Sequence, residues 1–183
     1  LDGDKIRAGD AVNFSIGQGD TVITPLKLTQ MYAAIANGGK IMRPSVAKAV
    51  VSTDGKVIKK IGAKQLGTLP ATQATLNFLQ GALREVVTAG TGTGAFAGFP
   101  IAISGKTGTA QVVSINADED YDKSKLNKRQ WDHALFIAFA PAENPEIAIG
   151  LIVENGEHGS SVAAPIARKV LDAYMSNRED NGK

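Results

Sequence analysis

The apolar positions of the chain follow helical spacing in some segments and strand spacing in others. A first helix is predicted from Thr24-Pro25, an N-cap threonine followed by proline at the first helical position, to Asn37-Gly38-Gly39. A second helix is predicted from Ala71 to Ala89, with Gly90 beyond its end. Its apolar face carries Leu76, Leu79, Leu83 and Val86.

Other segments have the composition of strands. Val46 to Ser52 and Val57 to Ile61 flank Asp54-Gly55, which predicts a hairpin. Later in the chain, three strands are expected, the first of them opening on the apolar run that starts at Pro100: Ile101 to Val113, Ala134 to Ala140 and Glu146 to Glu154. Neighbouring strands of this kind indicate an antiparallel sheet flanked by helices, an α+β fold.

The remaining segments are a final helix and several connections. Ser160 or Ser161 is expected to cap the helix, which turns Val162, Ile166, Val170 and Tyr174 inward. Gly90 to Gly94 is predicted to be a flexible connector rather than a phosphate-binding loop, and Asn116 to Gln130 a polar, mobile loop. A frayed tail is expected over Arg178 to Lys183.

Composition limits the possible functions. A chain of 183 residues is one domain or part of one. Its net charge of +2 is too small to argue for nucleic-acid binding or for a membrane surface. The absence of cysteine excludes disulfides and thiolate metal sites, and the sequence indicates no cofactor and no metal. No apolar run approaches the roughly 18 residues of a membrane span.

The candidate chemistry lies in one octapeptide, Ser104-Gly105-Lys106-Thr107-Gly108-Thr109-Ala110-Gln111. Glycine inside a strand often marks a close approach by another molecule. Lys106 supplies a positive charge, and Thr107 and Thr109 supply hydroxyl donors for a carboxylate. A free strand edge can also pair with an extended peptide. The segment is therefore suited to bind a peptide that ends in a carboxylate.

This octapeptide resembles the Lys-Thr-Gly box of penicillin-binding proteins and serine β-lactamases. The similarity extends on both sides of the box and is closest to class B, elongation-type enzymes of the penicillin-binding protein 2 kind. It is carried by Phe14 to Gly19, Thr24-Pro25-Leu26, Tyr32 to Gly39, Asp132 to Phe136, Phe139-Ala140-Pro141, Val153 to Gly156 and His158 to Pro165. The resemblance implies that 1–177 are the C-terminal portion of a transpeptidase domain and 178–183 a tail.

The family carries two further boxes, Ser-x-x-Lys and Ser-x-Asn, before the Lys-Thr-Gly box. Ser45-Val46-Ala47-Lys48 fits the first pattern, but its surroundings indicate an extended strand rather than the helix start that the nucleophile requires. Ser114-Ile115-Asn116 fits the second pattern, but it follows the third box instead of preceding it. Both are interpreted as chance matches, so the nucleophilic serine is expected upstream of Leu1.

The resemblance implies a peptidoglycan D,D-transpeptidase that forms an acyl-serine intermediate and is acylated by β-lactams. Lys106 and Thr109 would be catalytic, Lys106 through its charge and Thr109 through its backbone N–H in the oxyanion hole. Substrate binding would involve Thr107, Gly108 and Gln111, with both threonine hydroxyls on the carboxylate.

Partners and location also follow from the resemblance. The partners would be a stem peptide ending in D-Ala-D-Ala, β-lactam antibiotics, the upstream part of the same protein and a glycosyltransferase. The protein would work at the extracytoplasmic face of the bacterial cytoplasmic membrane, anchored by an upstream segment. Two alternatives stay open: a catalytically inactive scaffold or β-lactam sensor, and a related hydrolase such as a D,D-carboxypeptidase or a β-lactamase.

Other motifs have simpler interpretations. A nucleotide-binding P-loop needs a glycine where Pro100 stands, so this possibility is rejected. His133 is expected to be a histidine satisfied at a strand start, and neither it nor His158 indicates a metal site. For Gly17-Gln18-Gly19, a structural turn and a role in shaping the site are equally supported.

Overall fold

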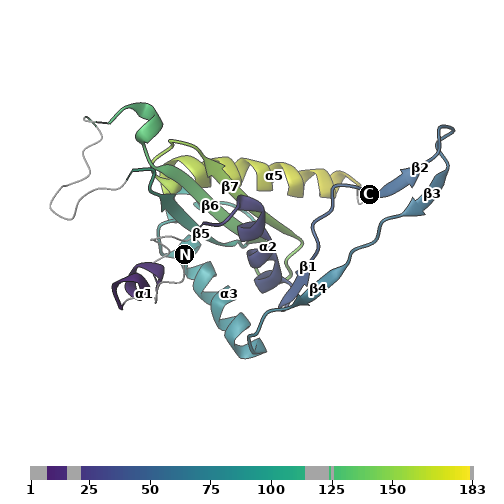
Figure 1. Cartoon of the computed structure of the whole chain (residues 1–183), viewed down its shortest axis with the longest axis horizontal. Helices are drawn as coiled ribbons and strands as arrows, with labels where there is room; N and C mark the ends of the chain where they lie inside the picture. Colours follow the sequence, from purple (N-terminus) through teal and green to yellow (C-terminus); the bar gives the residue numbers. More distant parts are fainter. Residues whose placement is uncertain (1–7, 16–21, 114–123, 125, 182–183) are drawn as a thin grey trace.

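The computed structural model describes residues 8–15, 22–113, 124 and 126–181. Its centre is an antiparallel sheet of three strands in the order β5 (Ser104–Ala110), β6 (His133–Ala140) and β7 (Ile147–Val153). The register pairs Gly105 with Ala138 and Ala138 with Ile149. Figure 1 shows this sheet flanked by helices, which confirms the predicted α+β class.

Helices cover both faces of the sheet. On one face α2 (Pro25–Ala36) packs on β6 and β7, and α3 (Gln73–Thr88) packs on β5. The other face carries α4 (Thr93–Phe96), the π-helical turn η3 (Gly159–Ala163) and α5 (Ala164–Asn181). Strand alternation explains this division. The Ser104 hydroxyl donates to the Gln80 carbonyl in α3, whereas a side chain at Gly105 would meet the Phe136 ring.

The core lies between the sheet and the second group of helices. Phe136 of β6 stacks on Phe96 of α4 with 5.3 Å between ring centroids. Around this pair, the buried cluster draws mainly on alanines and on Leu171, which is fully buried. Small side chains allow the helices to approach the sheet closely, so the position of β6 is well defined.

The predicted start of the first helix is confirmed. The Thr24 hydroxyl accepts a hydrogen bond from the Lys27 N–H (3.2 Å), with proline at the first helical position. The second helix was predicted from Ala71 but begins at Gln73, where the Thr72 hydroxyl caps it by accepting from the Thr75 N–H (3.1 Å). A helix that was not expected, α1, spans Ala8–Ser15. None of the described helices is long and apolar enough to cross a membrane.

The predicted hairpin around Asp54-Gly55 is also confirmed, with shorter strands. β2 (Ala49–Val51) pairs with β3 (Val57–Lys60), and Figure 1 shows the pair projecting from the body of the molecule. At its base, β1 (Lys40–Met42) pairs with β4 (Gln65–Thr68), which the sequence did not predict. β1 and β4 have three and four residues, which is too short to show a period-2 apolar pattern.

Two predictions around β5 were wrong in detail, and a third is largely untested. The strand begins at Ser104, not at Ile101, and it ends at Ala110 rather than Val113. Gly90 to Gly94 is not one open connector, because α4 begins at Thr93 and Gly92 is buried. Within the predicted loop from Asn116 to Gln130, most residues lie outside the described part, and Lys128–Gln130 form a 3₁₀ turn, η2.

The final helix differs most from the prediction. It begins with η3 after His158, and Ser160 and Ser161 lie inside this first turn instead of capping it. Ile166, Val170 and Tyr174 are exposed by 41%, 45% and 36%, so they do not form the inward face. The buried face is Ala163, Ala164, Ala167 and Leu171. Residues 178–181 continue the helix, so the expected frayed tail was wrong there.

Candidate active site

The box residues lie along the edge of the sheet. Within the described residues β5 has one neighbouring strand, β6, so its other edge is not paired with a strand. Lys106 and Thr109 are exposed, whereas Thr107 and Gly108 are half-buried. The Lys106 ammonium donates to the Thr107 carbonyl at 2.7 Å. Gln111 follows the strand and is exposed. Four of the five predicted site residues therefore share one strand, and the fifth directly follows it.

Gly105 allows β5 to lie close to β6. A Cβ at this position would lie 2.8 Å from the Ile137 carbonyl oxygen and 2.9 Å from the Ala138 Cβ. Real Cβ atoms do not approach other atoms so closely, so any larger residue would push the box strand away from its neighbour. Glycine is therefore required at this position of the motif because residues of β6 leave no room for a side chain.

A second glycine, Gly159, brings the start of η3 against the same strand. Its ideal Cβ would lie 2.5 Å from the Gly108 carbonyl oxygen, 2.9 Å from the Gly108 nitrogen and closer still to the Leu135 carbonyl oxygen. The backbone of η3 thus packs directly on the Lys-Thr-Gly segment. The sequence analysis noted Gly159 only as part of a family resemblance, because this contact joins residues far apart in the chain.

Thr91 reaches the box from the turn between α3 and α4. Its hydroxyl oxygen lies 2.7 Å from that of Thr107, a hydrogen bond between two side chains in which either can donate. Thr91 is exposed. The sequence analysis missed this residue, although the Gly-Thr-Gly pattern just before the box strand was a signal that could have found it.

Hydrogen bonds join the segment after β5 to the segment before β6, and that segment to the turn after β7. The Val112 N–H donates to the Asp132 carboxylate (3.4 Å), and the Asn155 N–H donates to Nδ1 of His133 (2.9 Å). The Asn155 side chain donates to the Trp131 carbonyl (2.8 Å). His133 is thus satisfied at the start of β6, as predicted. Among the described residues no group of three His, Cys, Asp or Glu side chains could hold a metal.

Of the two serine patterns outside the box, the structure describes only the one at Ser45. Ser45 lies in an irregular, exposed segment between β1 and β2, and its hydroxyl donates to the Ala47 carbonyl (3.1 Å). This segment is not the predicted strand, and it is also not a helix start, so Ser45 and Lys48 are not arranged on one helical face. Ser114-Ile115-Asn116 and Gly17-Gln18-Gly19 lie outside the described residues.

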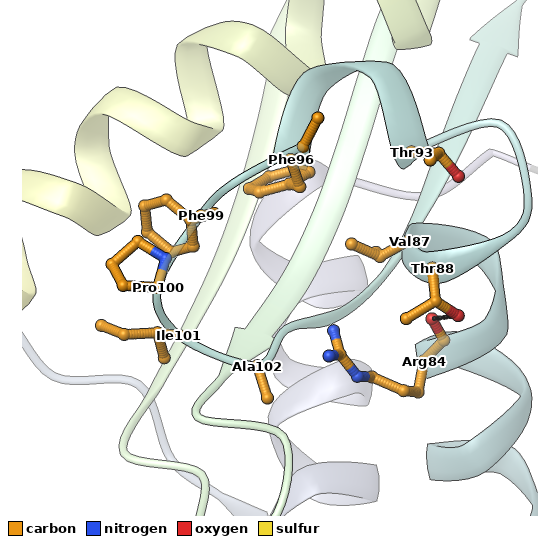
Figure 2. Close-up of a pocket in the computed structure, with 10 residues that line it drawn as sticks. Arg84, Val87, Thr88, Thr93, Phe96, Phe99, Pro100, Ile101 and Ala102 are labelled. Carbon is orange, nitrogen blue, oxygen red and sulfur yellow. Dashed lines mark hydrogen bonds between the residues drawn. The ribbon is translucent and has the colours of Figure 1, made fainter.

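A pocket of about 370 Å³ lies beside the N-terminal end of β5 (Figure 2). Its walls are formed by α3, α4 and the segment that leads into the strand. Arg84 spans its wall and donates to the Ile103 carbonyl at 3.0 Å, which ties α3 to the strand. None of the predicted site residues lines this pocket.

Comparison with known protein families shows to which family this chain belongs. Residues 4–172 match the penicillin binding protein transpeptidase domain. The chain belongs to this family. The resemblance deduced from the box and its flanking segments is therefore confirmed.

Individual relatives agree with this assignment. The chain is 39% identical to the peptidoglycan D,D-transpeptidase MrdA of Acinetobacter baumannii over 97% of its own length and 26% of the relative's. Among solved structures, penicillin-binding protein 2 of Pseudomonas aeruginosa in complex with WCK 5153 is 36% identical, with a TM-score of 0.71 over 91% of this chain and 33% of that chain.

A third relative was solved as an acyl-enzyme. Penicillin-binding protein A of Mycobacterium tuberculosis, in its ceftriaxone acyl-enzyme complex, is 30% identical, with a TM-score of 0.73 over 88% of this chain and 34% of that chain. The predicted penicillin-binding transpeptidase fold is thus confirmed. The chain spans about a quarter of the length of its Acinetobacter relative.

Proposed function

We propose that this chain is the part of a peptidoglycan D,D-transpeptidase that supplies the Lys-Thr-Gly strand and not the nucleophile. The observation that carries the proposal is the presence of Lys106, Thr107 and Thr109 on the sheet-edge strand of a penicillin-binding transpeptidase domain. Residues 1–177 are then the C-terminal portion of that domain. A serine upstream of Leu1, activated by a lysine one helical turn later, is the proposed nucleophile.

In the proposed reaction the serine oxygen attacks the carbonyl carbon of the penultimate D-alanine of a stem peptide. The bond to the terminal D-alanine breaks, and this D-alanine leaves with a proton. The amine of a second stem then attacks the acyl-enzyme ester and releases the serine. A β-lactam acylates the same serine, but its leaving group stays attached through the opened ring, so the ester persists.

Each box residue has a distinct part in this reaction. Lys106 supplies positive potential near the substrate carboxylate and assists proton movement. The hydroxyls of Thr107 and Thr109 donate to that carboxylate, Gly108 keeps the strand surface open, and Gln111 contacts the ligand further along. The Thr109 N–H donates to the developing oxyanion. Loss of one such donor typically slows acyl transfer on the order of 100- to 1,000-fold.

The free edge of β5 is the proposed binding surface for the stem peptide. An extended peptide pairs with such an edge through main-chain hydrogen bonds, and side-chain contacts then provide specificity. No strand pairs with this edge in the described residues. Gly105 and Gly108, which have no side chain, flank Lys106 and Thr107. In the proposed complex, the C-terminal carboxylate of the peptide lies near the two threonine hydroxyls.

The wider setting follows the family. The proposed partners are D-Ala-D-Ala stem peptides, β-lactams, the upstream part of the protein and a glycosyltransferase of the elongation machinery. The proposed location is the extracytoplasmic face of the bacterial cytoplasmic membrane. A D,D-carboxypeptidase or β-lactamase would pass the acyl group to water rather than to an amine, and an inactive scaffold or sensor would release no D-alanine.

Intact-mass analysis of the full-length protein with benzylpenicillin tests the proposal. We expect one penicillin adduct, and peptide mapping should find it on a serine outside these 183 residues. An adduct on Ser45 would overturn the assignment of this chain as the partner of the nucleophile. Release of D-alanine from a stem peptide, with and without an acceptor amine, separates transpeptidase from carboxypeptidase activity.

A further inference from the structure

A hydrogen bond joins Thr91, which has no part in the proposed reaction, to Thr107 of the box strand. The two hydroxyl oxygens are 2.7 Å apart, although the residues belong to different elements. Thr107 is half-buried in the box strand, and Thr91 lies exposed in the turn that follows α3. Thr91 therefore contacts a proposed substrate-binding group directly.

The turn that carries Thr91 is held in one position. The Gly92 N–H donates to the Val86 carbonyl (2.9 Å), and the Thr93 hydroxyl donates to the Gly90 carbonyl (2.8 Å). A Cβ at Gly90 would lie 2.9 Å from the Val86 Cα, so this residue packs directly on the end of α3. Thr91 thus sits between two glycines that fasten the turn to the helix.

The helix is in turn attached to the box strand. The Arg84 guanidinium donates to the Ile103 carbonyl (3.0 Å), and the Ser104 hydroxyl donates to the Gln80 carbonyl (3.2 Å). These bonds connect α3 with the first residue of β5 and the residue before it. The Thr91 turn and the box strand are consequently one structural unit, which makes the contact between the two hydroxyls a defined geometry.

The number of hydroxyl protons then decides the direction of the bond. A threonine hydroxyl has one proton to donate and can accept with its lone pairs. When Thr107 donates its proton to a carboxylate, Thr91 must be the donor in the bond between them. We propose that Thr91 is a positioning residue that donates to Thr107 and thereby directs the Thr107 proton to the substrate carboxylate.

This inference rests on the proposed role of Thr107 in carboxylate binding. Hydrogen bonds in a chain polarise one another, so a donor behind Thr107 strengthens its bond to the carboxylate. A neutral hydrogen bond typically contributes a factor of roughly 2 to 10 in an equilibrium constant. We expect Thr91 to contribute a factor of this size to reactions of carboxylate-bearing ligands, and little to others.

The test measures acylation of the full-length enzyme by benzylpenicillin and by its methyl ester, and takes the ratio of the second-order rate constants. Thr91→Val keeps the shape of the side chain and removes the hydroxyl, so it should lower the ratio roughly 2- to 10-fold. Thr91→Ser should restore most of it. Thr91→Ala provides a second hydroxyl-free variant if the valine disturbs folding. Thr88→Val is the matched control, because that hydroxyl bonds only within its own helix.

Further variants separate this inference from the proposed function. If Thr107→Val lowers the ratio while Thr91→Val and Thr91→Ala do not, the Thr91 inference is overturned and the role of Thr107 stands. If Thr107→Val leaves the ratio unchanged, the carboxylate-binding role itself fails. In the double variant the two effects should not add, since Thr91 acts through Thr107. Full additivity would also overturn the inference.

Discussion

Lys106 and Thr109 are exposed on an edge strand, so their replacement alters the proposed site without opening the core. In the full-length protein, Lys106→Ala should remove the charge proposed to attract the carboxylate. Thr109→Pro should remove the proposed oxyanion donor, because proline has no N–H. We expect acylation by benzylpenicillin, followed by stopped-flow or intact mass, to slow on the order of 100-fold or more for Thr109→Pro.

Two serine variants are the controls for this experiment. Ser45→Ala and Ser114→Ala should acylate at the wild-type rate, since neither serine is assigned a part in the reaction. Near-normal acylation in both Lys106→Ala and Thr109→Pro would contradict the site assignment. Loss of acylation in Ser45→Ala would instead mean that the nucleophile is present in this chain.

At the scale of elements, η3 packs closely on β5, and we expect this contact to position the box strand. Gly159→Ala adds a methyl group where the Gly108 carbonyl oxygen would be 2.5 Å away. Overpacking of this kind typically costs about 1–3 kcal/mol. We expect a lower midpoint of thermal unfolding and slower penicillin acylation, because the strand must shift to admit the methyl group.

Gly81→Ala is the matched control for this change. A Cβ at Gly81 meets no atom within 4 Å outside the adjacent backbone of its own helix, and the residue lies in the interior of α3. Alanine is favoured over glycine inside a helix by up to about 1 kcal/mol, so this variant should unfold at the same or a higher temperature and acylate normally. Equal behaviour of the two variants would show that η3 does not position the box strand.

At the scale of the whole molecule, many large apolar side chains are exposed in this chain. Phe78 is 74% exposed and Ile58 67%, and the apolar residues on the outer side of α5 are also uncovered. The chain spans about a quarter of its Acinetobacter relative, so we expect the rest of the protein to cover part of this surface. The isolated chain should bind a hydrophobic dye and unfold at a lower temperature than the full-length protein. Equal unfolding temperatures and no dye binding would contradict this expectation.

The sequence determined the features that depend on residues close together in the chain. The helix start at Thr24 follows from a hydroxyl that accepts an N–H three residues later, so the local sequence is enough to predict it. The sheet was predictable because β6 and β7 are long apolar strands that follow one another. The box was predictable because its chemistry occupies consecutive positions of β5.

Only the tertiary structure decided the features that depend on residues far apart. The inward face of the final helix was predicted to include Ile166, Val170 and Tyr174, but packing on the sheet buries Ala163, Ala164, Ala167 and Leu171 instead. Likewise, the contacts of Gly159 with Gly108 and of Thr91 with Thr107 exist only once the helices lie on the sheet. Local hydrogen bonding and periodicity are encoded in short windows of sequence, whereas backbone-to-backbone packing arises from the folded arrangement.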